Sequence, residues 1–271
     1  FLPPEPGDES GQGWARYTVS GAADAAQGTY LDAEASIVFD TNDPIATNTW
    51  RNRVGIPSGD VCPASDTDDG HFLCTLYPDV MGREPDAADK AYWLGRLGAG
   101  TSHTAVARTL LGSTEGRRTA VRAVYQGYLD RSPDPSGLAF WVDRLGHGSS
   151  PDAIRRQLLA SSEYLRRHGG TRAGFVAGLY GDVYGRPADP AGRAHWVAIL
   201  AGGRSRSSVA RSFLFAHEGR RAIVRDVYDD YLGRTLTFTE AQYWADRLLA
   251  QRDELRFRSE VLGSNEYATE V

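Results

Sequence analysis

Apolar positions in roughly the last two hundred residues recur with the spacing of short amphipathic helices. Most of these stretches follow a serine or an aspartate, residue types that cap the first turn of a helix. Stretches such as LYPDVMGR end near a glycine, which commonly stops a helix. The pattern predicts groups of three helices, twelve helices in all. Expected helix starts are Ser102, Ser150, Ser205 and Asp253 for the third helices, and Asp134 and Asp189, each followed by proline, for two second helices.

An internal repeat underlies these groups. Four sets of residues recur at the same intervals of 48, 55 and 48 residues, a register that chance does not produce four times. The seven extra residues of the middle interval fall in LRRHGGTRAGF, which predicts two close pairs of units joined by a looser Gly-Gly connection. The sets are Tyr77, Tyr125, Tyr180 and Tyr228; Arg83, Arg131, Arg186 and Arg234; Trp93, Trp141, Trp196 and Trp244; and Glu115, Glu163, Glu218 and Glu266.

The first sixty residues have a different pattern. Residues 1–12 have the proline, glycine and acidic composition of a linker. Apolar residues alternate along 35–39, which predicts a strand, and Trp14 to Val19 and Trp50 to Val54 predict two more. Three strands are too few to build a sandwich.

These patterns predict a mainly α fold, in which four tandem three-helix repeats follow a small antiparallel β segment. The expected domains are a linker (1–12), a partial β-sandwich module (13–60) and four helical repeats (61–118, 119–168, 169–221 and 222–271).

The charge balance argues against nucleic acid as a partner. The chain has 30 basic and 35 acidic side chains, a formal net charge of −5, and so lacks the basic excess that attracts phosphates. No run approaches the roughly 18–20 apolar residues of a membrane span, so membrane insertion is not expected. The chain begins at Phe1 without a methionine or a signal peptide, which suggests a processed or excised fragment.

Two cysteines, Cys62 and Cys74, flank turn-forming residues in VCPASDTDDGHFLC. Their spacing is not the C-x2-C of a structural zinc site. They are either two unrelated thiols or a disulfide that tethers the linker to the first helix. We favour the disulfide, which would contribute about 3 kcal/mol and indicate an oxidising compartment.

The helical units resemble a known family. LYPDVMGREPDAADKAYW, VYQGYLDRSPDPSGLAFW and LYGDVYGRPADPAGRAHW resemble the bacterial domain-of-unknown-function family 4214, which is similar in appearance to the helical linker domain of phycobilisomes. The resemblance implies a helical module of secreted and cell-surface bacterial proteins and no particular activity. The fourth unit, VYDDYLGRTLTFTEAQYW, lacks the Pro-Asp and the glycine, as expected of a terminal cap.

The β segment resembles a second family. ASIVFDTNDPIATNTWRNRV is similar to the C-terminal end of an immunoglobulin-like module of large bacterial surface proteins. The front half of such a module is missing, so its exposed strand edges need a partner. We expect the N-terminal 55 residues to complete their sheet against another chain; docking on the chain's own helices is the rival interpretation.

An aromatic ring precedes each repeated tryptophan, at Tyr92, Phe140, His195 and Tyr243. Neighbouring helical positions point about 100° apart, so ring and tryptophan cannot face one core equally. We expect the tryptophans in the core. The four rings either pack between units or line a groove that binds a ligand such as a sugar.

The recurring arginines and glutamates are expected to be structural. Each glutamate falls in the first turn of a helix, where the helix dipole favours an acid. Each arginine follows a helix end, where it can satisfy free carbonyls and pair with the glutamate of its own unit. Such a pair, if partly buried, would be expensive to break from one side.

Sequence motifs for catalysis are missing. Neither H-E-x-x-H, G-x-S-x-G nor a phosphate-binding glycine loop occurs, so we expect no enzyme and no required cofactor. Asp40, Asn42 and Asp43 form either a calcium site or an Asx-stabilised turn.

The leading hypothesis is a non-enzymatic extracellular or cell-surface protein that assembles with itself or with other envelope proteins through its helical repeats and incomplete β module. The alternative is a carbohydrate-binding module that recognises a polysaccharide.

Overall fold

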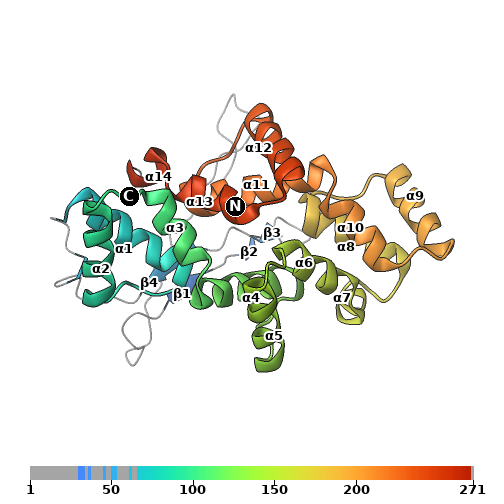
Figure 1. Ribbon diagram of the computed structural model, residues 1–271. Coiled ribbons are helices and arrows are strands. Elements are labelled where there is room, and N and C mark those ends of the chain that lie inside the picture. Colours follow the sequence, from blue (N-terminus) through green and yellow to red (C-terminus); the bar gives the residue numbers. More distant parts are fainter. Residues whose placement is uncertain are drawn as a thin grey trace. The chain divides into compact units, whose positions relative to one another are not determined.

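A computed structural model describes the backbone of residues 30–33, 36–37, 45–46 and 50–53, together with residues 61–62 and 66–269 (Figure 1). The chain divides into two compact parts, Phe1–Asp60 and Val61–Val271. We treat each part by itself and call the second the helical part.

Four short strands are described in the first part. Strand β1 (Tyr30–Ala33) pairs antiparallel with β4 (Trp50–Arg53), and β2 (Ser36–Ile37) pairs antiparallel with β3 (Ile45–Ala46). β2 and β4 overlap two of the strands predicted from the sequence, whereas the pattern did not mark β1 or β3. The strand predicted at Trp14 to Val19 lies outside the described residues. The predicted contact of this part with another chain remains a prediction.

The helical part confirms the predicted mainly α fold. Its described residues form fourteen helices instead of the predicted twelve. They are α1 (Asp68–Met81), α2 (Ala87–Gly98), α3 (His103–Leu111), α4 (Thr114–Leu129), α5 (Pro135–Gly146), α6 (Pro151–Ala160), α7 (Ser162–Arg167), α8 (Arg172–Tyr184), α9 (Pro190–Ala201), α10 (Arg206–Leu214), α11 (His217–Leu232), α12 (Phe238–Gln251), α13 (Glu254–Leu262) and α14 (Asn265–Thr269).

The predicted helix starts are confirmed. All six predicted capping residues occupy the N-cap position, and five of them accept a hydrogen bond from a backbone N–H in the first turn. The exception is Ser150, whose side chain makes no capping bond. Glycines with positive φ end α1, α8 and α11, as the sequence indicates, while Asp130 (φ 49°) takes that conformation at the end of α4.

The two additional helices, α7 and α14, contain the glutamate turn as a separate short helix. In α4 and α11 the glutamate turn continues directly into a helix of 16 residues. After α7 the chain instead passes through Gly169 and Gly170, with φ of 77° and 69°, a conformation that suits glycine and ends the helix. Helix α7 therefore stops at Arg167 and α8 begins again at Arg172.

A shift of 103 residues relates α1–α7 to α8–α14. It carries Ala87 at the start of α2 to Pro190 at the start of α9, and Ser162 at the start of α7 to Asn265 at the start of α14. We call α1–α3 segment I, α4–α7 segment II, α8–α10 segment III and α11–α14 segment IV.

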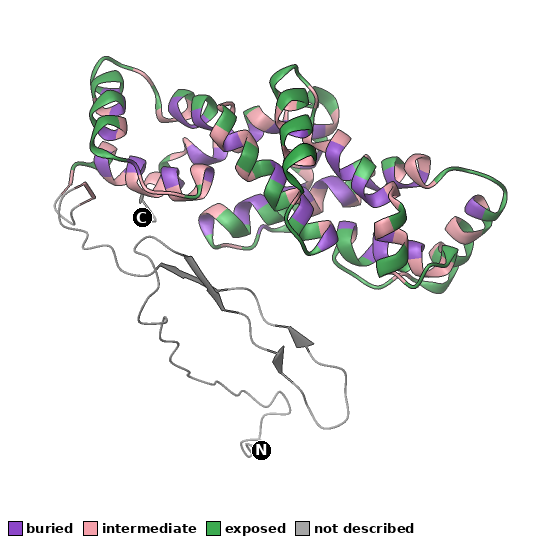
Figure 2. Cartoon of the chain, turned by 90° about the horizontal axis from the view of Figure 1, so that it is seen from below, coloured by how far each residue is buried: buried purple, intermediate pink, exposed green. Residues whose placement is uncertain are grey.

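Two hydrophobic cores hold these segments together, with buried positions on all the long helices (Figure 2). Segments I and IV share one core, where Phe72 and Tyr77 lie with Tyr267. Segments II and III share the other, where Tyr164 lies with Phe175. In both cores the third helices face each other, α3 against α13 and α6 against α10.

This pairing corrects two expectations. The Gly-Gly connection joins segments that share one core, because the reversal at Gly169 and Gly170 lets α8 pack beside α7. It is not a loose link between separate pairs. The fourth segment is not a terminal cap either, since α13 packs against α3 of the first segment. The chain's last helices thus close the first core.

Helices α4 and α11 link the two cores. The boundaries predicted after residues 118 and 221 fall inside these continuous helices. Glu115, near the start of α4, pairs with Arg83 of the first core, while Tyr125 further along belongs to the second core. Residues Val61–Val271 thus form one compact unit.

A buried ionic cluster lies where α6 meets α11 and α13. The Arg155 guanidinium donates to both carboxylate oxygens of Glu254, at 2.6 and 2.8 Å, and both side chains are at most 7% exposed. Glu254 also accepts from Arg258 at 2.9 Å, and Arg220 donates to Asp152 at 2.7 Å. Since α6 belongs to one core and α13 to the other, these ion pairs join the two cores.

Candidate functional site

The predicted disulfide is confirmed. Cys62 and Cys74 are bonded, with Cα atoms 5.8 Å apart, which ties the segment before α1 to the middle of that helix. Lys90 adds a second tie, because its ammonium donates to the carbonyl of Val61 and to the carboxylate of Asp66.

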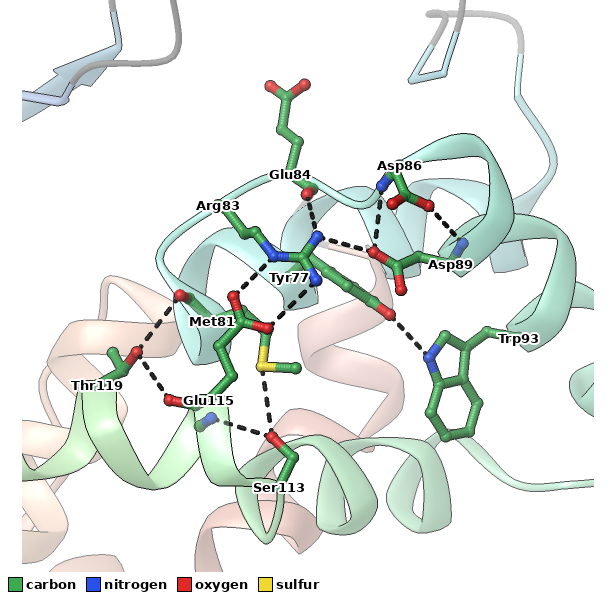
Figure 3. Close-up of polar contacts among 11 residues, drawn as sticks. Tyr77, Met81, Arg83, Glu84, Asp86, Asp89, Trp93, Ser113, Glu115 and Thr119 are labelled. Carbon is green, nitrogen blue, oxygen red and sulfur yellow. Dashed lines mark hydrogen bonds and ion pairs between the residues drawn. The ribbon is translucent and has the colours of Figure 1, made fainter. Parts of the chain in front are cut away.

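The repeated arginine sits in a defined cluster, shown for segment I in Figure 3. Arg83 donates to both carboxylate oxygens of Glu115, at 2.7 and 3.2 Å, and to Asp89 at 2.7 Å. Its guanidinium lies over the ring of Tyr77, 5.3 Å from the centroid. Trp93 donates its indole N–H to the Tyr77 hydroxyl at 2.9 Å. Burial raises the pKa of Tyr77 to about 12, so this hydroxyl stays protonated.

The same cluster recurs in the other three segments, which confirms the predicted arginine–glutamate contacts. Each arginine donates from Nε and Nη2 to the two oxygens of its glutamate, and its guanidinium lies 5.0 to 5.4 Å from the centroid of the repeated tyrosine ring. The pairs are Arg131 with Glu163, Arg186 with Glu218, and Arg234 with Glu266, over Tyr125, Tyr180 and Tyr228.

These pairs are more exposed than the sequence suggested. The Arg186 and Glu218 side chains are 42% and 33% exposed, and the other pairs are similar. Hydrogen bonds to Glu218 raise the pKa of Arg186, so the charge persists at any ordinary pH. Exposed pairs of this kind contribute about 1 kcal/mol or less, so at this exposure we expect a smaller cost than the several kcal/mol of a buried pair.

The rings that precede the tryptophans point into solvent. Tyr92 and Tyr243 are 58% exposed and Phe140 is 48% exposed, whereas Trp93 and Trp141 are buried as predicted. His195 is also exposed. Each ring meets its neighbouring tryptophan edge-on, with centroids 4.9 to 5.4 Å apart. The alternative that these rings pack between units is therefore wrong.

The structure does not gather the four rings into one groove. They lie on α2, α5, α9 and α12, which occupy separate places in the helical part (Figure 1). Each of these helices packs against the first helix of its own segment. Their role in ligand binding remains a prediction, but it now concerns four separate sites instead of a shared one.

Arginines accompany two of these rings. Arg144 lies over Phe140 and Arg247 over Tyr243, with guanidinium-to-centroid distances of 5.6 and 5.8 Å. Phe238, on the same helix as Tyr243, is 63% exposed, and the sequence analysis missed it because it stands outside the repeated positions. These surfaces combine an apolar ring with a charge.

A polar cavity is the other feature that sequence reasoning missed. It measures about 400 Å³ and opens to the surface between α4, α7 and α8. Its lining residues are Gly127, Tyr128, Asp130, Arg167, His168 and Asp182. The available signal was the stretch LRRHGGTRAGF, which holds the seven extra residues of the middle interval and supplies Arg167 and His168.

Ion pairs and hydrogen bonds organise the wall of this cavity. His168 Nε2 lies 3.1 Å from Asp182 Oδ2, and the Tyr164 hydroxyl donates to the same oxygen at 2.7 Å. Arg167 lies 3.6 Å from the Asp130 carboxylate. Burial and the nearby Asp182 charge raise the pKa of Tyr164 well above its usual range, so Tyr164 remains a hydrogen-bond donor to that carboxylate.

The predicted calcium site, Asp40, Asn42 and Asp43, lies outside the described residues. Among the residues that are described, no group of three or more histidine, cysteine, aspartate or glutamate side chains could hold a metal ion. Within the same part of the chain, no helix is long and apolar enough to cross a membrane.

The fold and these sites define a mainly helical, disulfide-tethered protein with a repeated arginine cluster. Residues 63–120 and 155–223 match the family described as Domain of unknown function (DUF4214), which confirms the predicted domain family for these two stretches. Residues 1–53 match Domain of unknown function (DUF7619), a family the sequence analysis did not anticipate. The similarities to immunoglobulin-like modules and to phycobilisome linkers remain predictions. Comparison with curated proteins and with solved structures gave no significant match.

Proposed function

We propose that this is a non-enzymatic extracellular or cell-surface protein that mediates assembly or adhesion through its helical segments. The observation that carries the proposal is the exposure of one aromatic position on four separate helices. An aromatic ring that stays in water does not contribute the hydrophobic free energy that it would contribute if it were buried. Three such rings on one chain, each more than 45% exposed, are what a surface that makes contacts provides.

The separation of the rings favours a multivalent mode of binding. A single exposed ring with a neighbouring arginine offers a small, weak contact. Several such contacts on one rigid body act together once the first is made, because the later ones become intramolecular, and the gain reaches roughly 10²–10⁴ in avidity. The ring positions on α2, α5, α9 and α12 suit repeated or multimeric partners: further copies of this chain or other envelope proteins.

We also infer that the helical part consists of four copies of one three-helix unit. The four arginine–glutamate–tyrosine clusters and the 103-residue shift between α1–α7 and α8–α14 support this inference. Each arginine is engaged by its glutamate and lies over a tyrosine, so its donors maintain the unit. This supports a structural role over a catalytic one.

The disulfide supports the extracellular placement. Disulfides such as Cys62–Cys74 persist in oxidising compartments and are rare in reducing ones. The incomplete β module would add a second contact by pairing its strands with another chain. Deleting residues 1–55 and measuring mass by light scattering tests that contribution: loss of an oligomer supports strand pairing, and an unchanged monomer in both proteins contradicts it.

The carbohydrate-binding alternative has an observation in its favour, because exposed rings beside arginines can also stack on sugar faces. A four-ring variant, with Tyr92, Phe140, His195 and Tyr243 all replaced by alanine, distinguishes the two. Assembly predicts that oligomers dissociate while glycan-array signals stay unchanged. If the rings bind sugar, the four-ring variant should lose its glycan-array signals, and both proteins should be monomeric. A variant in which Ala91, Ala139 and Ala194, exposed on α2, α5 and α9, are replaced by serine is the matched control.

A further inference from the structure

The cavity between α4, α7 and α8 is a built feature of the second core. Its walls come from the C-terminal end of α4, from α7 and from α8, elements that share one hydrophobic core. About 400 Å³ falls within the usual range of small-molecule sites, roughly 300–1,000 Å³. The cavity therefore has both a packed frame and room for a ligand.

Glycines fix the position of His168 on this wall. A Cβ atom at Gly178 would lie 2.5 Å from His168 Nδ1, so the ring packs directly on the backbone of α8. The ring of Tyr164 covers it from another side, with centroids 4.3 Å apart. A Cβ at Gly174 would collide with the His168 carbonyl at 1.8 Å. The inserted histidine is thus held in place by packing as well as by its close approach to Asp182.

The repeat itself does not require this cavity. At the positions 103 residues further on, Asp230 stands where Gly127 does and Gly233 stands where Asp130 does. Gly127 leaves open space, since a Cβ there would meet nothing within 4 Å. Asp130 adopts a positive φ of 49° where the other three first helices end in glycine. Two residues that depart from the repeat therefore shape this wall.

The charges on the wall favour a neutral ligand. Arg167 lies 3.6 Å from the Asp130 carboxylate and His168 lies 3.1 Å from the Asp182 carboxylate, so both basic side chains already have a carboxylate partner. An ionic ligand would have to displace one of these partners. The described residues also offer no set of three metal ligands. A neutral molecule with many hydroxyl groups can donate to the carboxylates and accept from the arginine without breaking either pair.

We propose that this cavity binds a neutral sugar residue, with Asp130, Arg167, His168 and Asp182 hydrogen-bonding its hydroxyls and Tyr128 supplying an apolar surface. Carboxylates and arginine match the paired donors and acceptors of vicinal hydroxyls, and an aromatic side chain contacts the C–H groups of a pyranose face. This site is distinct from the four exposed rings.

Filling the cavity is the most direct test. Gly127→Leu places a side chain in the open space of the cavity. Gly127 lies inside helix α4, where replacing glycine does not strain the backbone. Gly95→Leu is the matched control, since Gly95 is an exposed glycine inside α2 whose Cβ also meets nothing within 4 Å. Saturation-transfer NMR and calorimetry on the full chain would use glucose, galactose, mannose, N-acetylglucosamine, cellobiose and maltose, with glycylglycine and phosphate as charged probes.

We expect at least one of the sugars to bind the unchanged protein and Gly95→Leu equally, and to bind Gly127→Leu at least roughly tenfold more weakly, a loss of about 1.4 kcal/mol. Binding that survives in Gly127→Leu overturns the assignment. So does a protein that binds only the charged probes, or none of the molecules. The four-ring variant keeps the cavity intact and should retain sugar binding whatever its oligomeric state; loss of sugar binding there would contradict the cavity as the site.

Discussion

Replacing Glu254 by glutamine should destabilise the protein far more than the same change in a repeated cluster. Glu254 accepts two hydrogen bonds from Arg155 and one from Arg258, and its side chain is 6% exposed. The amide keeps the shape but removes the charge, so Arg258 loses its carboxylate partner and Arg155 keeps only Asp152, at 3.2 Å. Breaking a buried pair from one side costs about 3–5 kcal/mol.

The matched control is Glu218→Gln. Glu218 also accepts both donors of an arginine, but its partner Arg186 is 42% exposed. Water screens this pair, so the control should cost about 1 kcal/mol or less. For a protein of this size, about 1 kcal/mol corresponds to roughly 2–4 °C in Tm. Glu254→Gln should therefore lower Tm by roughly 6–20 °C, and Glu218→Gln by no more than about 4 °C.

The pH dependence gives an independent check. Burial alone would raise the pKa of Glu254, but the charges of Arg155 and Arg258 hold it well below its usual range. A carboxyl group with a depressed pKa stabilises the folded protein at pH values above its pKa in the unfolded chain, about 4.3. This stability is lost as the pH falls toward the pKa of the folded protein. The stability gap between wild type and Glu254→Gln should therefore narrow below about pH 4.

Denaturant unfolding followed by circular dichroism measures both effects. Equal losses for Glu254→Gln and Glu218→Gln, or a gap that does not change with pH, would refute the view that this buried cluster joins the two cores.

Three further predictions follow from single contacts. Arg186→Ala should lower the unfolding free energy by about 1 kcal/mol, measured by thermal unfolding, and a loss of several kcal/mol would contradict the exposed geometry. Intact mass with and without reductant should differ by one disulfide, and Cys62→Ser with Cys74→Ser should cost about 3 kcal/mol; two alkylatable thiols in the untreated protein would oppose this. Asp130→Gly should stabilise the chain by up to roughly 1 kcal/mol by relieving a positive φ, while weakening sugar binding at the cavity; a destabilised variant would count against that reading.

Local features of the fold were predictable because each depends on a few neighbouring residues. The N-caps at Ser102 and Asp253 and the arginine–glutamate pairs follow from residue types at fixed spacings. Tyr77 and its equivalents were identified as repeated, but their place beneath the guanidinium was not. Local chemistry was thus visible in the sequence.

The pairing of segments was not predictable from the repeat. Identical units carry the same apolar faces, so nothing in their pattern states whether segment I packs against segment II or segment IV. The contact of α3 with α13 joins residues about 150 positions apart and depends on the whole chain path. The seven-residue insertion was visible, yet its effect depends on how Gly169 and Gly170 reverse the chain, which places His168 beside Asp182.

The proposal of multivalent assembly is tested most directly by sedimentation velocity at micromolar concentration, comparing the full chain with the four-ring variant. We predict concentration-dependent oligomers for the full chain and for the serine control. The four-ring variant should sediment as a monomer with an unchanged circular-dichroism spectrum. A full chain that is monomeric at every concentration, or oligomers that persist unchanged in the four-ring variant, would contradict the proposal.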